Sequence, residues 1–199
     1  MSGITAVMVK ELREKTGAGM MDCKAALNDC DGDMDKAVDF LRKKGLATAQ
    51  KRAGRSMSEG TIQSYIHMGG KIGVMVEVNC ESDFVAKNED FQAFARGIAM
   101  HIAATNPVSI TPEEVSQETV DKEMEIYRGQ AKEMGKPENI AEKISEGKLQ
   151  KFFKDNCLMN QAYVREPEKT IADYLNEQIA KIGENISIKR FSRFQLGED

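Results

Sequence analysis

Residues 72–88 read Ile72-Gly73-Val74-Met75-Val76-Glu77-Val78-Asn79-Cys80-Glu81-Ser82-Asp83-Phe84-Val85-Ala86-Lys87-Asn88. In the first half, the even-numbered residues from 72 to 78 are apolar and share one face, which is the period of a half-buried strand. The strand then ends abruptly, and Ser82 or Asp83 can cap a new helical turn by accepting hydrogen bonds from the free amides that follow. The pattern predicts a strand followed by a turn that carries Phe84 beyond the sheet edge.

Phe84 has two possible roles. A bulky aromatic side chain beside a carboxylate, on a junction held by a rigid strand, suits insertion into another protein. The alternative is that the turn is capped and the ring joins the local core, as most large apolar side chains do. A ring buried deep inside its own fold would exclude the first role.

Residues 79–87, Asn79-Cys80-Glu81-Ser82-Asp83-Phe84-Val85-Ala86-Lys87, resemble the motif N-C-x-T-D-F-V-A-K of bacterial elongation factor Ts. That family exchanges nucleotide on the translational GTPase elongation factor Tu. Ser82 stands where the family has Thr, and it keeps the hydroxyl. The resemblance implies that four residues displace magnesium in the partner: Ser82, Asp83, Phe84 and Val85.

The first 45 residues predict a compact three-helix unit. Thr5 can cap the first helix, which Gly17 ends; a second begins near Met20; Asp33 can cap a third, which Gly45 closes.

Residues 9–27, VKELREKTGAGMMDCKAAL, are similar to the amino-terminal signature of the same family, a ubiquitin-associated-like module that docks on elongation factor Tu. The resemblance implies contacts from Lys10, Arg13, Met20 and Met21. The alternative for the methionines is that they fill the core of the module, since methionine adapts to irregular gaps.

Residues 46–58 have poor periodicity and predict a linker. A basic run precedes and enters it: Arg42, Lys43, Lys44, Lys51, Arg52 and Arg55. Either it is a solvated helix end or it binds nucleic acid. The net charge of −4 argues against a general nucleic-acid binder, and we expect no direct nucleic-acid partner.

Residues 59–199 predict an α+β core domain. Residues 61–67 alternate as a strand, and Gly69-Gly70 can turn the chain into the strand at 72–80. The hairpin resembles that of the family, which implies that His67 faces the GTPase; the alternative is a polar surface residue. A helix from Asn88 with a wide apolar stripe should cover one sheet face.

A helical hairpin is predicted at about 112–156. Thr111-Pro112-Glu113-Glu114 reads as a capping box that starts a helix, and Gly135-Lys136-Pro137 separates it from a second one. The apolar spacing of the first helix, at Val120, Met124, Tyr127, Ala131 and Met134, is typical of a coiled coil. The hairpin is either a contact surface or a self-contained stalk.

Pro167 is predicted to open the last helix, and a strand follows at 186–196. Residues 182–186 and 190–194 resemble the I-G-E-N-I and R-F-x-R-F stretches of the family. The strand would complete a three-stranded antiparallel sheet with one face free. The chain has one copy of a core subdomain that longer family members have twice, which implies a homodimer.

Several classes of function are disfavoured. The sequence has no phosphate-binding loop, no H-E-x-x-H and no G-x-S-x-G, so we expect no enzyme active site and no cofactor. The four cysteines form no C-x-x-C pair, which favours reduced thiols in the cytoplasm and argues against a bound metal. No apolar run approaches the roughly 20 residues of a membrane span. A peptide-binding scaffold and an RNA-binding protein are the rival classes.

Overall fold

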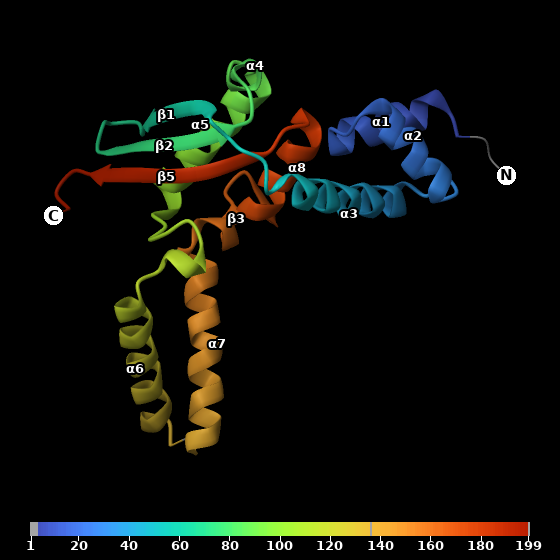
Figure 1. The fold of residues 1–199 in the computed structure, drawn as a ribbon. Coiled ribbons are helices and arrows are strands. Elements are labelled where there is room, and N and C mark those ends of the chain that lie inside the picture. Colours follow the sequence, from blue (N-terminus) through green and yellow to red (C-terminus); the bar gives the residue numbers. More distant parts are fainter. Residues whose placement is uncertain (1–3, 136, 199) are drawn as a thin grey trace. The chain divides into compact units, whose positions relative to one another are not determined.

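The computed structural model describes residues 4–135 and 137–198, which form an α+β protein with eight α-helices (Figure 1). The three long strands are β1 (Glu59–Ile66), β2 (Ile72–Cys80) and β5 (Ile186–Gln195), and they form one sheet in the order β1-β2-β5. The predicted α+β class is confirmed.

Both outer strands run antiparallel to β2. His67 N donates to Ile72 O at 2.9 Å across the hairpin, and Leu196 N donates to Lys71 O at 2.8 Å, which places the end of β5 beside the start of β2. The hairpin turn uses positive φ angles at Gly69 and Gly70, as predicted, because glycine adopts them without strain. The three-stranded antiparallel sheet is therefore confirmed.

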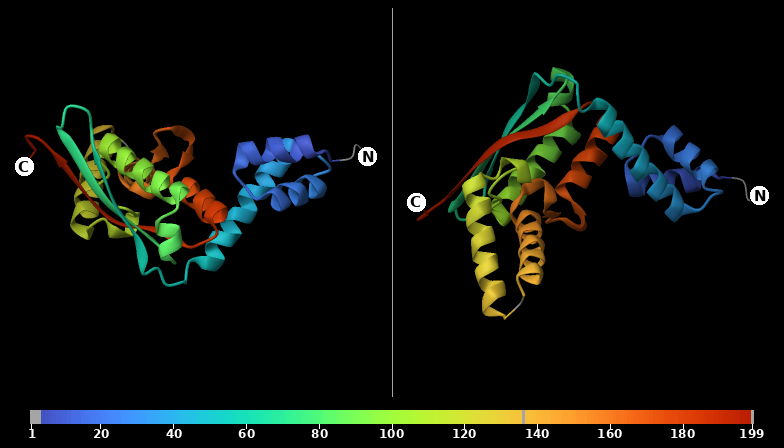
Figure 2. Two further views of the ribbon diagram at one scale, coloured as in Figure 1. Left: turned by 90° about the horizontal axis from the view of Figure 1, so that it is seen from above. Right: turned by 60° about the horizontal axis from the view of Figure 1, so that its bottom comes forward.

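Burial in β2 follows the predicted alternation. Val74, Val76 and Val78 are buried, whereas Met75 is exposed. Helix α5 (Glu89–Thr105) lies along one face of the sheet (Figures 1 and 2), and its apolar stripe is buried. Asn88 caps this helix, since its Oδ1 accepts from Asp90 N at 2.8 Å.

The chain divides into two compact units. The first unit comprises Met1–Ile62, Glu77–Ala95 and Asp173–Ser187, and the second comprises Gln63–Val76, Arg96–Ala172 and Ile188–Asp199. The sheet and α5 contribute residues to both units.

The first unit begins with three helices, α1 (Ala6–Thr16), α2 (Met20–Asp29) and α3 (Met34–Arg52). The predicted caps are confirmed, because Thr5 accepts from Met8 N and Asp33 accepts from Lys36 N. These helices share one core: Val9, Leu12, Cys23, Ala26, Leu27, Ala37 and Leu41. The likeness of this bundle to a ubiquitin-associated module stays a prediction.

Helix α3 does not end at Gly45, so the predicted helix end is wrong, and residues 46–52 of the predicted linker at 46–58 are helical. Gly45 remains helical, and a Cβ on it would lie 3.5 Å from Ala180 Cβ, which places this part of α3 against α8. Arg42 pairs with Asp173 at 2.9 Å, and Arg52 donates to Ile179 O at 3.4 Å. Contacts with α8 (Ile171–Ile182) thus override the weak periodicity.

Pro167 does not open the last helix. It lies in β4 (Glu166–Thr170), which pairs antiparallel with β3 (Ala162–Tyr163), and α8 begins only at Ile171. A two-stranded ribbon tolerates proline because an edge position does not require its missing N–H. Residues 162–170 have no alternating pattern that would reveal such short strands.

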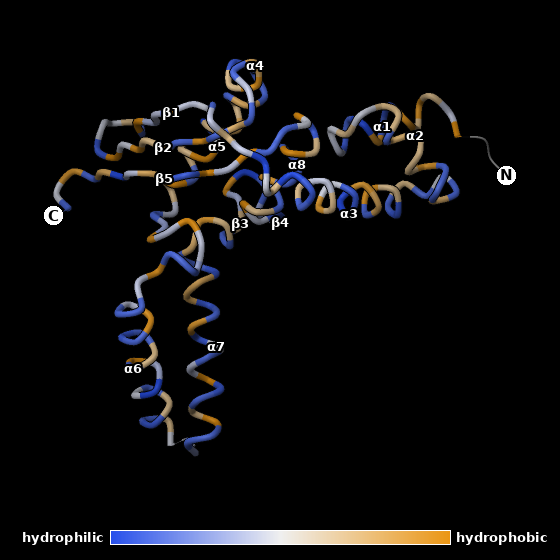
Figure 3. Tube along the Cα trace, viewed as in Figure 1, coloured by the Kyte–Doolittle hydropathy of each residue, from blue (hydrophilic) through white to orange (hydrophobic). Residues whose placement is uncertain are grey.

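The second unit contains the predicted helical pair, α6 (Gln117–Glu133) and α7 (Glu138–Asn156), which Figure 3 shows as mostly hydrophilic. The predicted start at Thr111 is wrong, since Pro112–Glu114 is one 3-10 turn and Ser116 caps α6 by accepting from Thr119 N. Val115 has extended backbone angles and interrupts the helix between the two caps. A bidentate pair, Arg128 with Glu142, joins the helices; coiled-coil packing stays a prediction.

Candidate functional site

The site begins where β2 ends. Cys80 is its last residue, and the four-residue helix α4 (Asp83–Ala86) starts after two more. Of the two predicted caps, Ser82 is the one used, because its Oγ accepts from Val85 N at 3.4 Å. The Asp83 carboxylate instead pairs with Lys87 Nζ at 2.8 Å across the turn.

The pKa values of Asp83 and Lys87 shift in the directions that an ion pair requires. The hydrogen bond from Lys87 lowers the pKa of Asp83, and the same bond raises the pKa of Lys87. Asp83 therefore stays ionised near neutral pH. Because both groups are on the surface, the pair adds little to the stability of the fold.

Phe84 lies on the outside of the turn with 82% of its surface exposed. Ala86 is buried and Val85 is half-buried, so one side of α4 packs against the rest of the first unit and the other side carries the exposed ring. The alternative in which the ring joins the local core is wrong. An aromatic ring this exposed is available to another molecule.

A second segment holds this turn in place. Glu184 lies between α8 and β5, and its Oε2 accepts from Glu81 N at 3.1 Å and from Ser82 N at 3.0 Å. Its Oε1 accepts from Ser82 Oγ at 2.6 Å. One carboxylate thus binds three donors from two consecutive residues just before α4.

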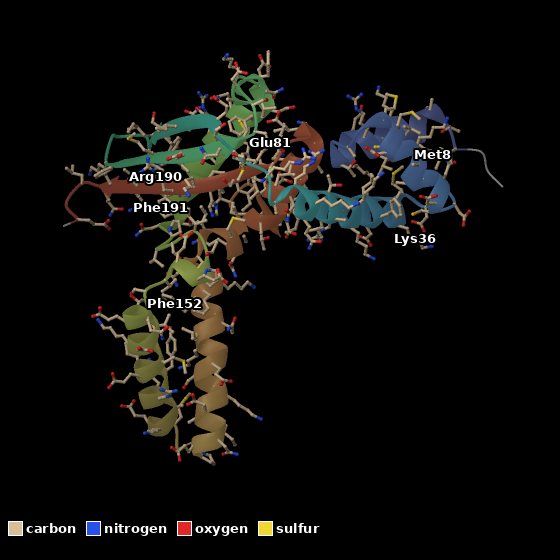
Figure 4. All side chains as sticks on the ribbon, in the orientation of Figure 1. Met8, Lys36, Glu81, Phe152, Arg190 and Phe191 are labelled. Atoms are coloured by element: carbon tan, nitrogen blue, oxygen red, sulfur yellow. The ribbon has the colours of Figure 1, made fainter. Side chains whose placement is uncertain are left out.

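Glu81 makes the reciprocal contact and is labelled in Figure 4. Its carboxylate accepts from Asn185 N at 2.6 Å and from Arg55 Nη1 at 3.2 Å. The Asn185 N–H, and then the Arg55 guanidinium, lower the pKa of Glu81. Each acidic side chain therefore binds the backbone of the other segment, and we call the pair Glu81 and Glu184 the carboxylate clasp.

The Cys80 thiol does not act as a nucleophile at this site. Burial raises the pKa of its thiol to about 11, and its Sγ donates to Ser82 O at 3.2 Å. The thiolate, which is the reactive form, is therefore scarce at neutral pH. Within residues 4–135 and 137–198, no group of three or more His, Cys, Asp or Glu side chains could hold a metal ion.

The predicted docking residues of the first unit are on its surface. Met20 is 54% exposed and Met21 is 76% exposed, so the alternative in which they fill the core is wrong. Lys10 and Arg13 are exposed on α1, and Lys10 lies 3.8 Å from Glu14 in a weak pair along the helix. All four side chains are accessible to a partner.

His67 belongs to the second unit and is exposed at the end of β1. Its Nδ1 lies 3.2 Å from Tyr65 Oη. The structure is compatible with both predicted readings of this residue.

The basic run near α3 is largely engaged inside the chain. Arg42 pairs with Asp173, Lys44 pairs with Asp22 at 2.8 Å and Arg55 pairs with Glu81. These contacts favour a structural role for the run over a phosphate-binding one, because paired cations attract phosphate less.

The comparisons with known proteins decide the family. The family model described as Elongation factor TS matches residues 45–198. The chain is 67% identical over 198 residues to Elongation factor Ts of Desulfosudis oleivorans, with all of both chains covered. It is 60% identical to Elongation factor Ts of Syntrophobacter fumaroxidans, with 98% of each chain covered. This chain belongs to the elongation factor Ts family.

Proteins of the elongation factor Ts family exchange nucleotide on elongation factor Tu and are not enzymes with chemistry of their own. The family therefore implies elongation factor Tu as the partner. No α-helix in the described part of the chain is long and apolar enough to cross a membrane.

Sequence reasoning missed the carboxylate clasp. Glu184 and Asn185 lie in the I-G-E-N-I stretch, whose resemblance to the elongation factor Ts pattern marked these residues. The resemblance did not predict that they contact residues about a hundred positions away.

Proposed function

We propose that this chain binds elongation factor Tu in its GDP complex in the cytoplasm, displaces magnesium and releases GDP, so that GTP can rebind. The observation that carries the proposal is Phe84, an 82% exposed aromatic ring on a turn whose backbone is held by charged hydrogen bonds. A ring held in this way can enter a partner without first being freed from its own fold.

Exchange follows from differential binding. A factor that binds the GTPase more tightly without nucleotide must weaken nucleotide binding by the same factor, because the coupling is reciprocal. Burying one Phe side chain contributes about 1.5–3 kcal/mol. If the ring is buried beside the magnesium site of elongation factor Tu, this energy is enough to shift the backbone of that protein that holds the metal and the phosphates.

Docking and exchange use different residues in this proposal. Lys10, Arg13, Met20 and Met21 hold the partner through the first unit, and His67 contacts it from the second. The exposed methionines support this division, because flexible apolar side chains adapt to a partner surface. Ser82, Asp83 and Val85 shape the turn that carries Phe84.

We also propose that two copies of the chain associate through the open face of the sheet. Ile66, Met75 and Phe194 are exposed by 65%, 51% and 69%. Met75 faces away from the buried valines of β2, and a Cβ on Gly73 would lie 3.1 Å from Ile66 Cδ1, which places Ile66 on the same face as Met75. Arg193 donates to Ala103 O of α5, so the next residue along β5, Phe194, points to the face opposite this helix. Light scattering at micromolar concentrations should give twice the chain mass, and a monomer mass throughout would exclude the dimer.

The exchange proposal is tested with elongation factor Tu loaded with fluorescent GDP. A small molar fraction of this chain should accelerate GDP release many-fold, because each molecule acts repeatedly. Binding without faster release would support the peptide-binding scaffold instead. Tight binding to bare RNA that weakens steeply with salt would support the RNA-binding alternative.

A further inference from the structure

We propose that Glu184 is a positioning residue for nucleotide exchange: its carboxylate fixes the turn that aims Phe84 at the partner. The inference rests on the proposed function, and it assigns a role to a residue that lies 100 positions after the ring in the sequence. The partner contact itself is made by Phe84, and Glu184 acts through residues 81 and 82.

The turn needs an external support. Helix α4 has only four residues, and an isolated helix of that length is unstable in water because nucleation is unfavourable. Phe84 is 82% exposed and so contributes little packing of its own. The direction of the ring is therefore set by the backbone that precedes it.

Glu184 supplies that support to both the backbone and the Ser82 side chain of the turn. It binds the backbone amides of Glu81 and Ser82, which fixes the path by which the chain leaves β2. Its Oε1 also accepts a hydrogen bond from Ser82 Oγ at 2.6 Å, a short distance that is typical of a strong bond to a charged oxygen.

The Ser82 hydroxyl connects the clasp to the helix. Because its proton is donated to Glu184, the oxygen lone pairs remain for Val85 N at 3.4 Å, the bond that caps α4. Removing the carboxylate would free the hydroxyl to rotate and weaken the cap. Glu184 thus controls the one side chain that starts the helix carrying Phe84.

The contact is also specific in its geometry. Asn185, the next residue, is 4% exposed and donates its backbone N–H to Glu81, so the two segments are joined in both directions. A separate ion pair in the same unit joins Lys181 and Asp90 at 2.8 Å, and neither residue takes part in the hydrogen bonds that form the clasp. Asp90→Asn therefore removes a nearby carboxylate charge without altering the clasp.

A fluorescence measurement tests the positioning directly, without the partner. The chain has no tryptophan, so Phe84→Trp introduces a single indole on the turn. Adding Glu184→Gln should lower the fluorescence anisotropy of that indole, since glutamine lacks the charge and one acceptor oxygen. Adding Asp90→Asn should leave it unchanged. Equal anisotropy with and without Glu184→Gln would overturn the proposal.

Exchange assays provide the second test, at a temperature where circular dichroism shows each variant folded. Glu184→Gln and Ser82→Ala should lower the maximal rate of GDP release about 5- to 10-fold, with half-saturating concentrations within about twofold of the original chain. Ser82→Thr should restore most of the rate because it keeps the hydroxyl.

The two proposals fail in distinguishable ways. If the unaltered chain does not accelerate GDP release, the proposed function fails, while the anisotropy still tests the clasp. If it does, Glu184→Gln should add no further loss to Phe84→Ala, because both act through the ring. An unchanged maximal rate, or a loss that adds fully to that of Phe84→Ala, would overturn the role of Glu184.

Discussion

Phe84→Ala separates the exchange activity from the stability of the fold. Only 18% of the residue's surface is covered within the chain, as 82% is exposed. Truncating an exposed side chain usually changes the free energy of unfolding by less than about 0.5 kcal/mol. Alanine also favours helix more than phenylalanine does, so α4 should be retained.

The expected loss of activity follows from the area that the ring can still bury. Full burial of a Phe side chain in the partner contributes about 1.5–3 kcal/mol. Each 1.4 kcal/mol is a factor of ten, so removal of the ring should slow stimulated GDP release about 10- to 150-fold.

Stopped-flow release of fluorescent GDP from elongation factor Tu measures this loss. Val108→Ala is the matched control, since Val108 is 59% exposed and lies in the other unit. This variant should stimulate GDP release at the original rate. With the metal removed by EDTA, the unaltered chain and Phe84→Ala should differ much less, because there is no magnesium left to displace. Unchanged release by Phe84→Ala in magnesium would refute the role of the ring.

Three further predictions concern docking and stability. Met20→Glu should raise the half-saturating concentration about tenfold while the maximal release rate is retained, since charge on a buried contact is unfavourable; equal affinity in a titration would contradict it. Gly60→Ala should lower the free energy of unfolding by about 1–3 kcal/mol in urea, because the new Cβ would lie 2.2 Å from Val78 O, whereas Gly54→Ala has nothing within 4 Å and should not. Burial lowers the pKa of His101 below its ordinary 6.5, so stability should be full above that pH and fall below it, where the unfolded chain binds the extra proton. The unfolding temperature of His101→Phe should lose this pH dependence, and that of His67→Gln, at the other histidine, should keep it.

Local patterns in the sequence predict the elements that depend on near neighbours. The alternation in β2, the caps Thr5 and Asp33, and the hairpin glycines are all found as predicted, because each depends on residues within one turn or strand. The same local pattern predicts that Phe84 lies on the turn, but it left open whether the ring is exposed or joins the core, and the structure shows it 82% exposed.

Features that depend on distant contacts were predicted wrongly or missed. Helix α3 passes through Gly45 because α8 packs there, and periodicity within residues 46–52 contains no trace of a partner so far along the chain. Pro167 signals a helix start as readily as an edge strand, and only the pairing with β3 decides. The clasp joins residues 81 and 184, whose proximity depends on the sheet bringing the end of β2 beside the start of β5.

The uninterrupted course of α3 has a mechanical consequence. Within the first unit, α3 is bound to α8 at its middle by Arg42 and at its end by Arg52, and α8 leads directly into the turn that contains Glu184. A flexible connection at residues 46–52 would leave the first three helices free to rotate about the rest of the first unit. Because α3 continues as a helix to Arg52, the surface that we propose for docking and the turn that carries Phe84 belong to one connected set of elements.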